Sequence, residues 1–181
     1  IRTGASCIGV ENQDGKIVLN ADCDEGAEKI IGSHLLLAVG RKPNTDDLGL
    51  DKAGVETDER GYVTVDDALQ TNVSGIWAIG DMNGRGAFTH TSYNDYEILA
   101  ANMFDNDPRK ISDRITNYGL FIDPPLGRVG MTETQARESG KKVLIGKMMM
   151  ARIGRARERS ETQGFMKVLV DADTKRILGA N

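Results

Sequence analysis

The stretch TNVSGIWAIGD, residues 71–81, decides the fold predicted for this chain. Its apolar run Ile76–Ile79 ends abruptly at Gly80-Asp81, and a short apolar run bounded by turn residues is typical of a strand buried on both faces. Ligands of α/β proteins sit at the ends of such strands. Gly80 has no Cβ, so a bulky cofactor can approach its backbone, and the Asp81 carboxylate can accept hydrogen bonds from sugar or polyol hydroxyls. Many strands end in Gly-Asp without a ligand, so these two residues alone favour a structural turn.

The residues that follow Asp81 predict a loop over 82–87 and then a helix. Apolar residues at the i, i+3, i+4, i+7 spacing of one helix face are Tyr96, Leu99, Ala100 and Met103. Thr89 and Thr91 are candidate N-caps, because a threonine hydroxyl can accept from the N–H groups of the first turn. A helix start carries a partial positive charge that suits an anion or an electron-rich ring edge. Strand, Gly-Asp turn, loop and helix start therefore form one predicted ligand-holding unit.

The composition is that of a soluble globular protein. Of the 181 residues, 39% are apolar and 28% are charged. A net charge of −4 and a pI near 5.3 argue against nucleic acid or an anionic membrane as a partner. Cys7 and Cys23 match no redox or metal-binding spacing, which predicts reduced, inert thiols in a cytoplasmic protein. His34 and His90 have no Cys or His neighbour at ligand spacing, so we predict no metal site.

The first part of the chain is predicted to form short strands and turns. The residues NQDG, 12–15, are a hairpin signal between Cys7–Glu11 and Lys16–Asn20. Leu35–Val39 is a continuous apolar run and predicts a buried strand that ends at a Gly-Arg-Lys-Pro turn. Gly61–Val65 alternates in character and predicts an edge or half-buried strand.

A second pattern begins after the linker over residues 105–110, where we predict a domain boundary. Tyr118–Ile122 predicts a strand, and TETQ, residues 132–135, is a capping-box pattern that opens a short helix. Further strands are predicted over 143–150 and 165–171 and from residue 177 onward. This order indicates an α+β layer with an antiparallel sheet. Because the pattern stops within the sheet, Phe165–Leu178 is expected to expose an unpaired edge.

Four motifs, in this order, carry a resemblance to a known family: LLLAVGRKPN, TNVSGIWAIGD, PPLGRVGMTETQA and TQGFMKVLVDADTKRILGA. Together they resemble the FAD-dependent pyridine nucleotide-disulfide oxidoreductases, the family of dihydrolipoamide dehydrogenase, glutathione reductase and mercuric reductase. The resemblance covers nearly the whole chain.

The resemblance implies an α/β plus α+β fold in three parts. Residues 1–44 would be the tail of a Rossmann-like NAD(P)H-binding domain. Residues 45–110 would be the C-terminal part of the FAD-binding domain, and residues 111–181 the start of an antiparallel-sheet dimerisation domain. The implied cofactors are FAD and NAD(P)H. The implied assembly is a homodimer through the last part.

The resemblance also implies roles for individual residues. Gly40 would lie against the nicotinamide cofactor. Gly80 and Asp81 would meet the flavin ribityl chain, with Asp81 holding a hydroxyl. Backbone N–H groups would face the pyrimidine edge of the flavin from a further segment, made of Ala87, Phe88, Thr89 and His90. There the helix start would favour the negative charge of reduced flavin.

Several parts of the family pattern are absent from this sequence. There is no G-x-G-x-x-G fingerprint, no redox C-x-x-x-x-C and no C-terminal His-Glu pair, so no catalytic residue is predicted in this stretch. It is expected to be the back half of such an enzyme, cut at both ends. The segment His90–Tyr96 departs from the usual pattern of a His, small residues and Glu-Gly, which puts a lipoamide or glutathione substrate in doubt. It looks closer to the branches of mercuric reductase and of resistance to reactive chlorine.

Three functions stay open at this point. In the first, which we expect, hydride passes from NAD(P)H through FAD to a redox disulfide outside this stretch, and then to a disulfide, a metal ion or a related acceptor. In the second, a flavin-dependent NADH reductase without a redox disulfide reduces ferredoxin, quinone or oxygen. In the third, the chain is a non-catalytic dimerisation module. We expect the intact protein to be cytoplasmic and this stretch by itself to be inactive.

Overall fold

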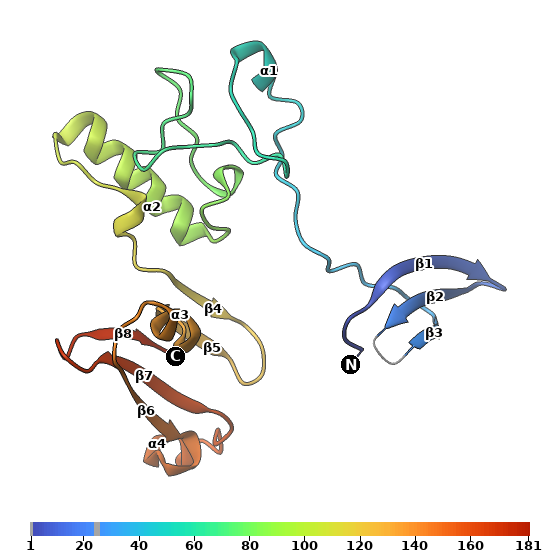
Figure 1. The fold of residues 1–181 in the computed structure, drawn as a ribbon. Coiled ribbons are helices and arrows are strands. Elements are labelled where there is room, and N and C mark those ends of the chain that lie inside the picture. The colour runs from blue at the N-terminus through green and yellow to red at the C-terminus, as the bar shows by residue number, and fades with distance from the viewer. Residues whose placement is uncertain (1, 24–25) are drawn as a thin grey trace. The chain divides into compact units, whose positions relative to one another are not determined.

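The computed structural model describes residues 2–23 and 26–181 (Figure 1). The chain divides into two compact units, Ile1–Lys42 and Pro43–Asn181, and each is described by itself. Both units build their sheets from antiparallel strands, and helices occur in the second. This mixed α/β content agrees with the predicted fold class.

The first unit is a three-stranded antiparallel sheet in the order β1-β2-β3. Its strands are β1 (Ser6–Gln13), β2 (Lys16–Cys23) and β3 (Gly26–Gly32). The predicted hairpin is confirmed: Gln13 pairs with Lys16, and the turn residues Asp14 and Gly15 have φ of 51° and 76°. Two left-handed residues give the turn that suits the twist of the flanking strands. The side chains of Cys7 and Cys23 lie outside the described ones.

The prediction of a buried strand at Leu35–Val39 is wrong. This segment forms no strand, and Leu36 and Val39 are each 87% exposed. An apolar run becomes a strand only when neighbouring strands satisfy its N–H and C=O groups. Neither sheet of the described residues pairs with it, so the apolar content alone does not fix its structure.

The second unit begins with an irregular layer packed on one long helix. This helix, α2 (Thr89–Ala100), continues as a π-helical turn, η2 (Ala101–Asp105). The shorter helical elements are α1 (Leu50–Ala53), η1 (Asp81–Asn83) and η3 (Ile111–Asp113). The buried apolar core of this layer consists of Val55, Val63, Val65, Leu69, Ala78 and Ile98.

The predicted strand at Ile76–Ile79 is also absent. Only Trp77 makes an isolated bridge, with Gln70, and the Ala78 N–H donates to the Leu69 carbonyl at 3.1 Å. Ala78 is buried, but Ile79 is 39% exposed. Among the described residues, the segment therefore has a β partner on one flank only. One isolated bridge does not make the regular strand, buried on both faces, that was predicted.

Gly61–Val65 differs from its prediction in the same way. Its only β pairing in the described structure is the isolated bridge between Thr57 and Val63. The predicted alternation does hold for burial, because Val63 and Val65 are both buried and Thr64 between them is exposed. A half-buried extended segment is present without a regular ladder.

The helix predicted after the loop over residues 82–87 exists, but its cap and its buried face differ from the prediction. The N-cap is Phe88 in an extended conformation, without a side-chain cap, so Thr89 and Thr91 lie inside the helix. The face predicted to be buried is solvent-facing at two positions, with Tyr96 53% and Met103 47% exposed. The buried residues of α2 are Thr91, Asp95 and Ile98. The face of α2 that lies toward the core thus combines the apolar Ile98 with two polar residues, Thr91 and Asp95.

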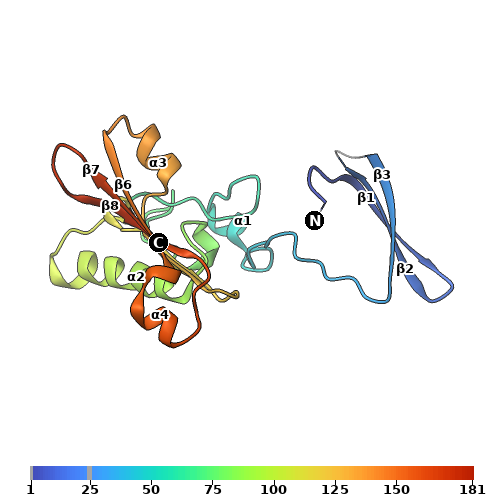
Figure 2. The same cartoon turned by 90° about the horizontal axis from the view of Figure 1, so that it is seen from below.

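The second half of this unit is a five-stranded antiparallel sheet in the order β4-β5-β8-β7-β6 (Figures 1 and 2). The strands are β4 (Asn117–Leu120), β5 (Leu126–Gly130), β6 (Val143–Met149), β7 (Phe165–Asp171) and β8 (Ile177–Ala180). The α+β layer is thus confirmed. The expected unpaired edge at Phe165–Leu178 is wrong, because β7 lies between β6 and β8, and β8 lies between β7 and β5.

Three short helical elements accompany this sheet: α3 (Glu133–Glu138), η4 (Met150–Arg152) and α4 (Gly154–Glu158). The predicted capping box at the start of α3 is confirmed. The Thr132 hydroxyl accepts from the Gln135 N–H at 3.0 Å, and the Gln135 side chain accepts from the Thr132 N–H at 2.9 Å. Within the described part of the chain, no helix is long and apolar enough to cross a membrane.

Candidate functional site

The Gly80-Asp81 turn has a backbone that only glycine adopts readily. Gly80 has φ 78° and ψ −163°, a region that L-residues avoid. A Cβ at Gly80 would lie 3.3 Å from the Ser92 hydroxyl oxygen, so this turn lies against the first turns of α2. The Gly80 carbonyl accepts from the Asn83 N–H at 3.1 Å, which closes the tight turn η1. Asp81 begins η1 and is exposed.

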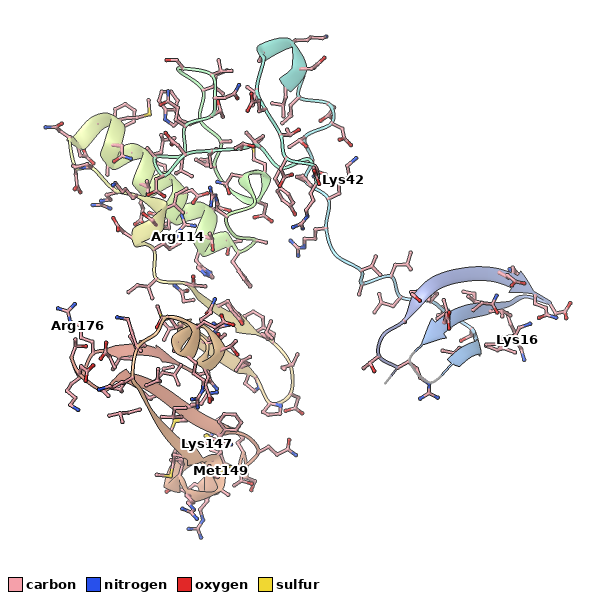
Figure 3. All side chains as sticks on the ribbon, in the orientation of Figure 1. Lys16, Lys42, Arg114, Lys147, Met149 and Arg176 are labelled. Carbon is pink, nitrogen blue, oxygen red and sulfur yellow. The ribbon has the colours of Figure 1, made fainter. Side chains whose placement is uncertain are left out.

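A buried carboxylate stands behind this turn. Asp95, on α2, is 1% exposed and accepts from the Gly80 N–H at 2.8 Å and from the Asn83 side-chain amide at 2.8 Å. Its other oxygen forms an ion pair with Arg114, which Figure 3 labels beside α2. The Asn83 amide donates also to the Ala78 carbonyl at 3.1 Å. A charged acceptor with three donors can remain buried because each partner replaces a bond to water.

The sequence prediction missed Asp95, Asn83 and Arg114. The available signal was the spacing of Thr91, Asp95 and Ile98, which is i, i+4, i+7 on one helix face. A charged residue in the middle of such a stripe is compatible both with a buried, paired carboxylate and with an exposed surface residue. The partner Arg114 is 19 residues away, and no local pattern connects them.

A cleft of about 540 Å³ opens between the start of α2 and the segment that leads into β4. Phe88, His90 and Tyr118 line it. Phe88 stacks on His90 and on Tyr118, with ring centroids 5.4 Å and 5.8 Å apart. The His90 Nε2 lies 2.9 Å from the Asn117 carbonyl, which can only accept, so Nε2 carries a hydrogen and donates. The predicted segment Ala87–His90 therefore contacts β4 through aromatic stacking and a hydrogen bond.

The loop before this segment is tightly packed on the helix. A Cβ at Gly86 would fall well inside van der Waals contact with Thr91 Cγ2, and 3.1 Å from Thr91 Cβ. Because α2 begins at Thr89, the first N–H groups of the helix, including those of Thr89 and His90, have no acceptor within it. The close packing fixes where these N–H groups lie.

The predicted site residues are divided between the two units of the chain. In the second unit, Gly80 lies against Ser92 in the first turns of α2, and the segment Ala87–His90 leads into the same helix. Gly40 belongs to the other unit, where it is exposed with φ 117°. No group of His, Cys, Asp and Glu suited to hold a metal ion occurs among the described residues.

The chain belongs to the pyridine nucleotide-disulphide oxidoreductase family. The profile described as "Pyridine nucleotide-disulphide oxidoreductase" matches residues 1–95, and that of the family's dimerisation domain matches residues 116–181. These matches confirm the family resemblance that the four motifs carry.

Two curated relatives and a solved structure show how far the similarity extends. "Probable pyridine nucleotide-disulfide oxidoreductase RclA" of Escherichia coli K12 is 43% identical over 81% of this chain and 34% of its own length. The dihydrolipoyl dehydrogenase of Thermus scotoductus is 35% identical over 99% of this chain and 39% of its own length. The structure described as a Cu(II) complex of HOCl-induced flavoprotein disulfide reductase RclA from Escherichia coli matches with a TM-score of 0.84, at 36% identity, over 97% of this chain and 39% of that one. The chain thus spans little more than a third of the length of these relatives.

Proposed function

We propose that the intact protein is an oxidoreductase that passes hydride from NAD(P)H through FAD to a redox disulfide, and then to a disulfide, a metal ion or a related acceptor. One observation carries the proposal: in a chain of this family, the Gly80-Asp81 turn lies against the same helix start that Ala87–His90 forms. A dinucleotide flavin has a polyol chain and a ring edge that need such partners side by side.

The residues present fit a flavin. Asp81 is an exposed carboxylate next to a glycine without a Cβ, so a ribityl hydroxyl can donate to it at short range. The N–H groups at the start of α2 are held by the packing of Gly86 on Thr91 and would bind the pyrimidine edge of the ring. When bound, FAD supplies the redox chemistry. The chain's own part is to bind and orient the cofactor and to favour negative charge at that edge.

The nicotinamide cofactor, the domain division and the dimer belong to the same proposal. Gly40 would lie against NAD(P)H. The proposed domains are residues 1–44, 45–110 and 111–181. Apolar side chains are exposed on the two paired strands β6 and β7, among them Leu144, Met148 and Met166, at 50%, 44% and 45%. In a segment that matches the dimerisation domain, such side chains support burial against a second copy of the chain.

The proposed acceptors are a disulfide and a metal ion. The metal ion takes support from the relative RclA, whose structure is described as a Cu(II) complex. We place the activity in the cytoplasm, where NAD(P)H is supplied by metabolism.

The test uses the full-length protein. It is expected to purify with the absorbance of oxidised flavin and to oxidise NADH or NADPH when a disulfide substrate or a Cu(II) or Hg(II) salt is added. A colourless protein that takes up no FAD and oxidises neither nucleotide would contradict the proposal. A flavoprotein that keeps full turnover after its upstream cysteines are replaced would instead support a reductase without a redox disulfide.

A further inference from the structure

The Gly80 N–H has an acceptor that lies outside its own turn. The turn closes on itself through the carbonyls of Gly80 and Asp81, which accept from the N–H groups of Asn83 and Gly84, each at 3.1 Å. These bonds shape the turn but do not fix it on the helix. The Gly80 N–H donates instead across to Asp95 on α2, at 2.8 Å.

The same carboxylate oxygen also fixes the far end of the turn. Oδ2 of Asp95 accepts from the Asn83 amide at 2.8 Å, so one buried atom binds the residue before Asp81 and a residue two positions after it. Asp81 therefore lies between two residues, Gly80 and Asn83, that both donate a hydrogen bond to the same oxygen of Asp95. Two hydrogen bonds to one buried oxygen hold both ends of a backbone that L-residues avoid.

The second oxygen of Asp95 has a different task. Oδ1 pairs with Arg114, whose Nε donates to the Asn94 side chain at 2.7 Å. Arg114 follows directly after η3 and precedes β4. The ion pair thus joins α2 to the segment between the two layers of the unit, while the Oδ2 bonds join α2 to the turn.

We propose that Asp95 is the positioning residue of the Gly80-Asp81 turn: its Oδ2 sets the direction of the Asp81 side chain toward the cofactor, while its Oδ1 contributes to stability through Arg114. This inference rests on the proposed function, because it assigns to Asp95 the orientation of a flavin-binding carboxylate. The proposal is testable because the hydrogen bonds of Oδ2 to the turn and the ion pair of Oδ1 with Arg114 can be removed by different substitutions.

Three variants of the full-length protein separate the tasks. Asp95→Ala removes both. Asp95→Asn keeps one oxygen, and that oxygen faces the two donors of Gly80 and Asn83, because turning the amide around would place its NH₂ against both of them. Arg114→Met removes the ion pair and leaves the carboxylate on the turn. The dissociation constant of FAD is measured by titrating apoprotein, and the melting temperature of the same apoprotein is measured by circular dichroism.

The expected pattern is a split between the two measurements. Asp95→Ala raises the dissociation constant of FAD by about tenfold or more. The loss of a charged hydrogen-bond acceptor costs at least the free energy that corresponds to a change of about tenfold in affinity. Asp95→Asn and Arg114→Met stay within about threefold of the wild type in FAD affinity, although both lower the melting temperature. Ile98→Val, a core change on the same helix, lowers the melting temperature and leaves FAD affinity unchanged.

The proposal is overturned if FAD affinity falls in step with the melting temperature across all four variants, or if Arg114→Met weakens FAD as much as Asp95→Ala does. If Asp95→Ala does not fold, Asp95→Asn decides: retained affinity at a lower melting temperature supports the proposal, and a tenfold loss refutes it. Asp81→Ala serves as the reference. If it leaves FAD binding intact, the proposed function fails; if it weakens binding while the Asp95 variants do not, only the role of Asp95 fails.

Discussion

Replacing Gly86 by alanine is expected to displace the segment that leads into α2. The new methyl group would fall well inside contact with Thr91 Cγ2 and would lie 3.1 Å from Thr91 Cβ and 3.2 Å from its Oγ1. Thr91 is only 8% exposed, so it has little room to move. Added volume in a packed site costs about 1–3 kcal/mol.

The direction of the shift determines its effect on the cofactor. Helix α2 is anchored by Asp95 and Ile98 in the core, so the loop is expected to move and the helix to stay. Moving Ala87–His90 by a few tenths of an ångström lengthens the proposed hydrogen bonds to the flavin edge. Loss of about 1.4 kcal/mol there would raise the dissociation constant of FAD about tenfold.

A double variant tests this reasoning. Thr91→Ser removes Cγ2, the atom in closest contact, and is expected to restore part of what Gly86→Ala loses, with a coupling of about 1 kcal/mol between the two sites. Melting of the apoprotein and titration with FAD are measured for the wild type, both single variants and the double variant. Gly75→Ala is the control, because Gly75 has φ 84° but a Cβ there would meet nothing within 4 Å. Strictly additive losses would refute the contact with Thr91 as the cause.

The remaining predictions concern the rest of the chain. Thr132→Ala should lower the stability of the full-length protein by about 1 kcal/mol in thermal melting, because it removes the hydroxyl of the capping box at α3. The pKa of Asp171 lies below its ordinary value because backbone N–H groups of the next turn, first that of Thr174, donate to its carboxylate. The stability that this adds is present above the unfolded pKa of about 3.9 and is lost as the pH falls through the lower folded value, so Asp171→Asn should flatten the acid limb of a melting-temperature profile. Replacing Cys7 and Cys23 by serine should leave turnover of the full-length enzyme nearly unchanged, and a loss of turnover with the fold intact would show that they take part in the redox chemistry.

Features set by neighbouring residues were predictable from this sequence. The hairpin at residues 12–15 follows from an Asp-Gly pair that adopts left-handed backbone angles, and the start of α3 follows from a Thr and a Gln three residues apart. Four of the five strands of the second sheet were also predicted from their own apolar runs, whereas β5 (Leu126–Gly130) was not. In each case the information lies within a few residues of the structure that it determines.

Features that depend on distant partners were not predictable. Leu35–Val39 and Ile76–Ile79 have the composition of buried strands, but a strand needs neighbours, and the described residues supply none for the first and one flank for the second. Asp95 was missed for a related reason. Its burial depends on Arg114 and on the backbone of Gly80, and neither is near it in sequence. The site residues Asp81 and Ala87–His90 came from motifs of the family, and their roles stay predictions.

The binding of FAD by Asp81 tests the central claim most directly. In the full-length protein, Asp81→Ala would leave a cofactor hydroxyl unpaired, at a cost of about 1–3 kcal/mol, without unfolding a unit in which Asp81 is exposed. The measurement is the ratio of flavin to protein after purification, with the melting temperature of the apoprotein as the check on folding. The account predicts a folded protein depleted of flavin. A folded Asp81→Ala protein that retains a full complement of FAD would contradict it.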